Sequence, residues 1–282
     1  MATVEEHPGE PEPAPPAAPA PPAPRTPPPT AVPLDRRLLG WEVWLVLLLS
    51  LLGPTVSAVI SLAGALTAPE GLAEQEANLI VSYAERPWLD LAYQLRVLAF
   101  GFVPVLLALY LLRRGGGSAR SIGFDLRRPG RDLAVGALAA ALVGTGGLAV
   151  YLAAQATGLG VTVVPSTLQQ AWWQLPVLLG QAVKNGVLEE VIVVGYLLLR
   201  LDQLGWSPAR AVAASALLRG CYHLYQGFGM FFGNIVMGLA FGWFYHRYGR
   251  VMPLVVAHTL IDAVAFVGSA YLIGRVDWLP GA

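Results

Sequence analysis

The sequence predicts an all-α fold, a polytopic bundle of transmembrane helices, from its composition and from the length of its apolar segments. Hydrophobic residues make up 55% of the 282 residues and charged residues only 13%, and the mean hydropathy is +0.57. In soluble domains charged residues make up about 25%. Several apolar stretches reach the roughly 20 residues that a helix needs to cross about 30 Å of hydrocarbon.

The first 34 residues are predicted to form a separate, disordered tail. The segment from Pro8 to Pro33 consists mainly of proline and alanine and holds almost no bulky apolar side chains. Such a segment cannot build a core and favours extended polyproline conformations. The start of the chain has neither the basic region nor the apolar region of a signal peptide. The predicted organisation is a cytoplasmic tail, 1–34, followed by a transmembrane domain, 35–282.

Seven apolar segments are predicted to span the bilayer, and an eighth, re-entrant or broken segment is the open alternative. The first and fourth segments are longer than a bilayer requires, so they are expected to tilt or to continue beyond the hydrocarbon. In chain order the seven segments are Leu38–Leu66, Leu91–Leu112, Leu133–Ala154, Trp173–Leu201, Pro208–Tyr225, Gly229–His246 and Val251–Ile273.

The distribution of arginine predicts the orientation of these segments. Six arginines lie between the second and third segments, whereas the connection between the first and second carries four glutamates and only Arg86. Loops rich in Lys and Arg stay on the cytoplasmic side. The chain is therefore predicted to be a multi-pass plasma-membrane protein with a cytoplasmic N-terminus and an extracytoplasmic C-terminus.

Charge and cysteine content exclude some classes of partner and site. The formal net charge is zero, so nothing in the sequence indicates a nucleic-acid partner. The single cysteine, Cys221, excludes an intramolecular disulfide and a multi-cysteine metal site. The lipid bilayer is the partner that the composition predicts, and the oligomeric state stays open.

Ionisable residues inside three of the apolar segments are the candidate functional residues. Glu189 and Glu190 lie in the fourth segment, His223 in the fifth, and His258 and Asp262 in the seventh. A charged side chain at the centre of a membrane helix costs about 2.5–3.5 kcal/mol on insertion scales. His258 and Asp262 are four residues apart and share a helical face, whereas adjacent glutamates are about 100° apart and are predicted to point to different places. The pattern predicts an active site within the bilayer.

The order of these residues resembles the CAAX-processing and bacteriocin-processing (CPBP) family of intramembrane proteases. The resemblance covers roughly Gly180 to Phe266 and places a catalytic core at about 170–272. The family usually has the motifs EExxxR, FxxxH and HxxxN or HxxxD. In this sequence Val194 replaces the arginine of the first motif, Arg219 replaces the phenylalanine of the second, and the third motif is intact.

The resemblance implies a role for each motif residue. Glu189 and His223 would activate a water molecule, and His258 with Asp262 would form the oxyanion side. Because an ionised Asp262 would repel an oxyanion, it is expected to be protonated or to orient His258. A zinc mechanism with Glu189, His223, His258 and Asp262 as ligands is the alternative.

Arg219 is hypothesised to replace the missing arginine of the first motif. A carboxylate buried at low dielectric needs a cationic partner. Val194 lies about one turn from Glu190, and Arg219 lies about one turn from His223 on the next helix. Arg219 is therefore expected to pair with Glu190. Lys184, in the same apolar segment as the glutamates, has no predicted partner.

The predicted function is hydrolysis of peptide bonds in membrane-embedded or lipidated peptides or proteins. Whether the substrate is prenylated is left open, as is metal dependence. Because Val194 departs from the motif, a catalytically inactive relative that acts as a membrane scaffold is one alternative. A proton-linked transporter that uses the same buried residues is another.

Overall fold

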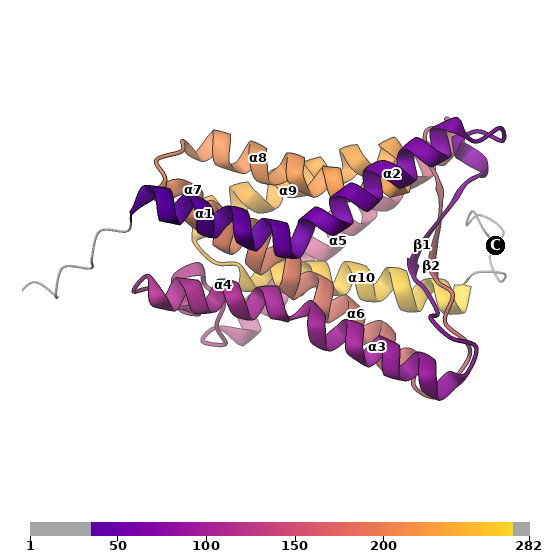
Figure 1. Cartoon of the computed structure of the whole chain (residues 1–282), viewed down its shortest axis with the longest axis horizontal. Helices are drawn as coiled ribbons and strands as arrows, with labels where there is room; N and C mark the ends of the chain where they lie inside the picture. The colour runs from indigo at the N-terminus through magenta and orange to yellow at the C-terminus, as the bar shows by residue number, and fades with distance from the viewer. Residues whose placement is uncertain (1–34, 273–282) are drawn as a thin grey trace, which may run out of the picture. The chain divides into compact units, whose positions relative to one another are not determined.

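The computed structural model describes residues 35–272. The predicted tail, 1–34, and the end of the seventh predicted segment at Ile273 lie outside the described residues. Within them, the helices lie side by side along the long axis of the bundle (Figure 1). In order they are α1 (Arg36–Leu47), α2 (Gly53–Thr67), α3 (Pro87–Gly101), α4 (Val103–Arg114), α5 (Pro129–Ala156), α6 (Gln174–Glu189), α7 (Leu197–Gln203), α8 (Pro208–Tyr222), α9 (Gly227–Tyr248) and α10 (Met252–Leu272).

Each of the seven predicted segments coincides with one helix or with two helices in line. Within residues 35–272, four helical stretches are long and apolar enough to cross a membrane: Arg36–Thr67, Pro87–Arg114, Pro129–Ala156 and Leu224–Tyr248. The other three do not meet that measure. The stretch α6–α7 is interrupted by charged residues, and α8 has 15 residues. Of α10 only Met252–Gly268, an apolar stretch of 10–17 residues, counts toward this measure. The helical class is thus confirmed, while the number of spans stays a prediction.

Three of the predicted segments are interrupted helices. A π-helical turn, Leu48–Leu52, joins α1 to α2, and a second one, Glu190–Tyr196, joins α6 to α7. Between α3 and α4 the helix breaks at Phe102, because Pro104 has no N–H to offer the preceding turn. A π-helical turn widens the helix by an additional residue and is frequent at functional sites. The second π-helical turn begins at Glu190, so the interruption coincides with the candidate site.

A small parallel sheet was not predicted from the sequence. Strand β1 (Glu76–Ile80) pairs with β2 (Thr162–Ser166), with Glu76 opposite Thr162 and Ile80 opposite Ser166. The β-branched residues of β2 favour an extended chain. The sheet connects the α2–α3 loop to the α5–α6 loop at one end of the bundle (Figure 1).

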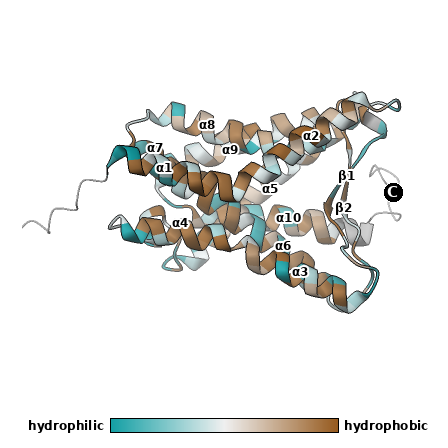
Figure 2. Ribbon diagram, in the orientation of Figure 1, coloured by the Kyte–Doolittle hydropathy of each residue, from teal (hydrophilic) through white to brown (hydrophobic). Residues whose placement is uncertain are grey.

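The most buried part of the bundle surrounds the second π-helical turn. The four residues Val191–Val194 are all 0% exposed. Three of them pack in the main apolar core with residues of α4, α7, α9 and α10, and Val193 packs with Leu51 and Tyr222. Large apolar side chains cover much of the outer surface as well, and α1, α2 and α3 are largely hydrophobic in Figure 2. Apolar side chains both inside and outside are expected of helices surrounded by lipid.

The loops predicted to be cytoplasmic contact one another. At the end of α7, Arg200 is buried and donates to the carbonyl of Leu111 on α4 at 3.0 Å. Arg250, between α9 and α10, pairs with Asp132 at 2.5 Å and with Asp125 at 3.1 Å. These contacts bring the arginine-rich connections to the same end of the bundle, as the orientation argument requires.

Candidate active site

The two glutamates lie where α6 passes into the second π-helical turn. Glu189 is the last residue of α6 and Glu190 the first of the turn. The Glu190 side chain is 0% exposed, whereas that of Glu189 is 13% exposed. The two carboxylates therefore differ in their access to solvent or substrate, although they are adjacent in sequence.

Arg219, on α8, contacts both carboxylates. Its Nη2 donates to Glu190 Oε1 at 2.6 Å, and its Nη1 lies 3.5 Å from Glu189 Oε2. The guanidinium also lies over the Phe241 ring at 5.7 Å. The predicted contact between Arg219 and Glu190 is thus present. The two carboxylates share this guanidinium but have different further partners, the Tyr222 hydroxyl for Glu189 and His258 for Glu190.

Val194, which replaces the motif arginine, lies in the apolar core. Its side chain is 0% exposed and is packed among other buried apolar residues. A cation at this position would lie in that core. The charge that Glu190 needs comes from the neighbouring helix instead.

His258 and Asp262 lie together on α10, as their spacing predicts. His258 Nδ1 is 2.7 Å from Glu190 Oε1, and its Nε2 is 3.6 Å from Asp262 Oδ1. Asp262 Oδ2 accepts a hydrogen bond from the Asn185 amide at 2.8 Å. Glu190 Oε1 therefore joins the arginine of α8 to the histidine of α10.

His223 lies beside this cluster without a direct hydrogen bond to it. It follows the last turn of α8, and its Nδ1 is 2.9 Å from the backbone carbonyl of Arg219. A carbonyl only accepts, so Nδ1 carries the proton and Nε2 is an acceptor in the neutral ring. Among residues 35–272, His223 forms no side-chain hydrogen bond to Glu189 or His258.

Two residues of the cluster were missed by the sequence analysis. Tyr222 donates its hydroxyl hydrogen to Glu189 Oε2 at 2.7 Å, and Asn185 donates to Asp262. The signal for Asn185 was its position four residues before Glu189, on the same face of α6. Tyr222 had a weaker signal, since it lies three residues after Arg219. Both are polar side chains within otherwise apolar segments.

The proposed zinc ligands do not gather into a ligand set. Within the described part of the chain, no group of three or more His, Cys, Asp or Glu side chains lies close enough to hold one metal ion. His258 directs its two ring nitrogens towards Glu190 and Asp262, and His223 uses Nδ1 on a backbone carbonyl. As arranged here, the side chains do not fit a zinc site.

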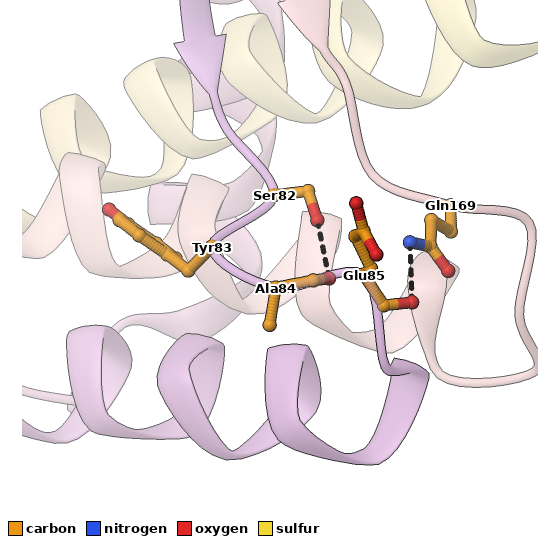
Figure 3. Close-up of a pocket in the computed structure, with 5 residues that line it drawn as sticks. All are labelled: Ser82, Tyr83, Ala84, Glu85 and Gln169. Carbon is orange, nitrogen blue, oxygen red and sulfur yellow. Dashed lines mark hydrogen bonds between the residues drawn. The ribbon is translucent and has the colours of Figure 1, made fainter.

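A shallow pocket of about 290 Å³ lies apart from this cluster, where the chain leaves β1. Ser82, Tyr83, Ala84, Glu85 and Gln169 line it (Figure 3). The Ser82 hydroxyl donates to the carbonyl of Ala84, and the Gln169 amide donates to the carbonyl of Glu85, at 3.1 and 2.9 Å. None of the predicted site residues lines this pocket.

The fold and the cluster define a class: a helical membrane protein with ion-paired carboxylates and histidines between α6, α8 and α10. Residues 171–264 match the family model described as type II CAAX prenyl endopeptidase Rce1-like. This match confirms the resemblance to the CPBP proteases over about a third of the chain, and it contains every predicted site residue. No curated protein and no solved structure matches the chain.

Proposed function

We propose that the protein is an intramembrane endopeptidase that hydrolyses peptide bonds in membrane-embedded or lipidated peptides. The observation that carries the proposal is a continuous set of contacts. It runs from Glu189 through Arg219 and Glu190 to His258 and Asp262. These residues lie within the segment that matches a protease family. Keeping so many ionisable groups between apolar helices is costly unless they perform chemistry.

Glu189 is the proposed general base. Its side chain is the more exposed of the two glutamates, and the Tyr222 hydroxyl fixes its Oε2. Glu189 takes a proton from water while the water oxygen bonds to the scissile carbonyl carbon. The proton then passes to the peptide nitrogen as the carbon–nitrogen bond breaks, leaving a carboxylate and an amine. The free Nε2 of His223 would accept a hydrogen bond from the same water.

Glu190 and Arg219 are proposed to position the reacting groups. Both side chains are fully buried and paired at 2.6 Å. The pair fixes His258 through the shared Oε1 atom of Glu190. A buried carboxylate with both a guanidinium and an imidazole as partners is held in one orientation. Glu190 therefore holds α8, through Arg219, and α10, through His258, in a fixed arrangement.

Asp262 is proposed to act as an acceptor that orients its neighbours. It lies beside His258 Nε2 and accepts from Asn185, which supports this role over that of an oxyanion ligand. A primary amide has two N–H groups, so Asn185 keeps a second donor while bonded to Asp262. We assign this second N–H to the developing oxyanion, because both ring nitrogens of His258 already face carboxylates.

A catalytically inactive scaffold is the second candidate. Two observations favour it: Val194 stands in place of the motif arginine, and His223 is hydrogen-bonded to its own helix rather than to Glu189. Such a protein would keep the buried ion pairs for stability and would bind membrane peptides without cleaving them.

Cleavage by purified protein in proteoliposomes tests the proposal. A library of plain, acylated and prenylated peptides would be incubated with the protein and read by mass spectrometry. We expect products with a new carboxylate and a new amine, formed with and without a chelator. Loss of cleavage with the chelator would instead favour the metal mechanism. Binding without cleavage would favour the scaffold, and proton flux in the same liposomes would favour a transporter.

A further inference from the structure

Lys184, on α6, is a cation between apolar helices that no described anion pairs with. Its side chain is half-buried. Among residues 35–272, no carboxylate lies within ion-pair distance of its ammonium group, whereas Arg219, Arg200 and Arg250 each have a carboxylate partner. An intramembrane cation without a partner is costly and is a candidate for binding an anion.

The fold makes room for the lysine at a specific place. A Cβ atom on Gly101, at the end of α3, would lie 2.5 Å from Lys184 Cδ and 2.9 Å from Cγ. Glycine at this position therefore leaves room for the lysine stem between α6 and α3, and a larger residue would require the stem to move. The break between α3 and α4 immediately follows, at Phe102. This close fit fixes the course of the side chain while leaving the ammonium group without a described partner.

Lys184 lies beside the candidate active site on α6. It is five residues before Glu189, and neither Glu189 nor Asp262 comes within the 4.0 Å of an ion pair with its ammonium group. Asn185, the next residue on α6, is part of the site itself. Lys184 therefore belongs to the surroundings of the site but not to its ion-pair network.

We propose that Lys184 binds a carboxylate of the substrate and thereby selects acidic peptides. This proposal rests on the proposed peptidase function. Lys184 and Glu189 are five residues apart, or about 7.5 Å along the helix axis. An extended peptide advances about 3.3–3.6 Å per residue. Allowing for the width of the helix, the bound carboxylate lies about two to four residues from the scissile bond. A free C-terminal carboxylate or an acidic side chain supplies the same group.

The test compares peptides that differ only in this charge. In the first pair, the C-terminus lies two to four residues from the cleaved bond and is either a free carboxylate or a carboxamide. In the second pair, the C-terminus is amidated in both peptides, and the residue two to four positions from the cleaved bond is either Asp or Asn. We expect the wild-type protein to cleave the acidic member of one pair with kcat/KM about 10-fold higher, the effect of one charge-assisted hydrogen bond. The peptide pair whose acidic member is cleaved faster shows whether the bound carboxylate is the C-terminus or an acidic side chain.

Substitutions then assign the preference to Lys184. Lys184→Met keeps a long stem against Gly101 and is expected to bring the acid-to-neutral ratio close to one. Lys184→Arg is expected to keep part of the preference. Arg96→Met is the matched control, since it removes an exposed cation from α3. The same ratio in wild type and Lys184→Met would overturn the proposal.

The outcomes separate the two proposals. Cleavage with an unchanged ratio would contradict only the role of Lys184. If the wild-type protein cleaved no peptide, the proposed function would fail. The affinities of the acidic and neutral peptides for wild type and Lys184→Met, measured by fluorescence polarisation, would then decide the role of Lys184. Equal affinities for both peptides in the wild-type protein would overturn it.

Discussion

At the scale of residues, the buried pair of Glu190 and Arg219 organises the site. Its charges were predictable, because a buried glutamate needs a cation and Arg219 lies at a suitable position on the next helix. The hydrogen bonds of Tyr222 and Asn185 were not predictable in the same way. They depend on the rotation of α6 and α8 about their axes, which helical spacing within one segment does not give.

Removing one partner of the buried pair is expected to destabilise the protein strongly. Glu190→Gln or Arg219→Leu alone removes the closest partner of a buried charge, at a cost of up to about 3–5 kcal/mol. The double variant removes both charges and is expected to recover much of this loss. Thermal unfolding of the four proteins in detergent, treated as a double-mutant cycle, measures the coupling. Additive losses in the double variant would show that the pair is not coupled.

Asn185 is expected to matter for the rate of cleavage more than for stability. Asn185→Ala removes the donor assigned to the oxyanion and is expected to lower kcat about 10²-fold, with a smaller change in KM. The exchange variant Asn185→Asp with Asp262→Asn keeps an amide beside a carboxylate and is expected to regain part of the rate. Steady-state kinetics on a cleaved peptide provides the measurement. An unchanged kcat in Asn185→Ala would remove Asn185 from the mechanism.

At the scale of elements, the position of α10 depends on how closely it packs against α5. A Cβ atom on Gly136 of α5 would lie 2.6 Å from Val256 Cβ and 2.8 Å from the carbonyl oxygen of Pro253. Both contacted residues are on the same helix as His258, two and five residues before it. The close approach of α5 is therefore one of the features that place His258 against Glu190.

Gly136→Ala is expected to push α10 away from α5. Overpacking of this kind costs about 1–3 kcal/mol, and the displaced His258 should lower cleavage as well. Gly144→Ala, on the same helix, is the control, because its new Cβ would lie 3.6 Å from Ile261 Cγ1, an ordinary contact. The helix propensity of alanine should leave this control as stable as wild type, or more so. Equal unfolding temperatures for both variants would contradict the packing argument.

The loop before α5 is held in place by ion pairs, so the contribution of these ion pairs to the stability of the fold should depend on pH. Hydrogen bonds from Arg127 and Arg250 hold the pKa of Asp125 well below its usual range. A carboxylate with a lowered pKa stabilises the fold above its unfolded pKa, near 4, and progressively less as the pH falls below that. Asp125→Asn should therefore be less stable than wild type at pH 7, and the difference should shrink towards pH 3. Thermal unfolding of both proteins between pH 7 and pH 3 measures this difference in stability. A difference that stays constant with pH would contradict the role assigned to Asp125.

At the scale of the whole molecule, hydropathy predicted the helical segments but not how they are interrupted or joined. A long, mainly apolar segment indicates a helix whatever its neighbours are, so each of the seven predicted segments coincides with helices. The pairing of β1 with β2 joins residues 86 positions apart, as Glu76 and Thr162 show. Neither strand is long enough to be indicated by its own sequence. Such long-range pairing is decided by the packing of the helices that bring the two loops together.

The central claim is that the cluster around Glu189 is an active site. Its most direct test is single-turnover cleavage of a membrane peptide by wild type, Glu189→Ala and Glu74→Ala in the same liposomes. Glu74 is an exposed glutamate outside the helical bundle, so its variant controls for the loss of a charge. We predict cleavage by wild type and Glu74→Ala, with loss of at least about 10²-fold in Glu189→Ala. Equal cleavage by all three proteins, with all three folded, would contradict the account.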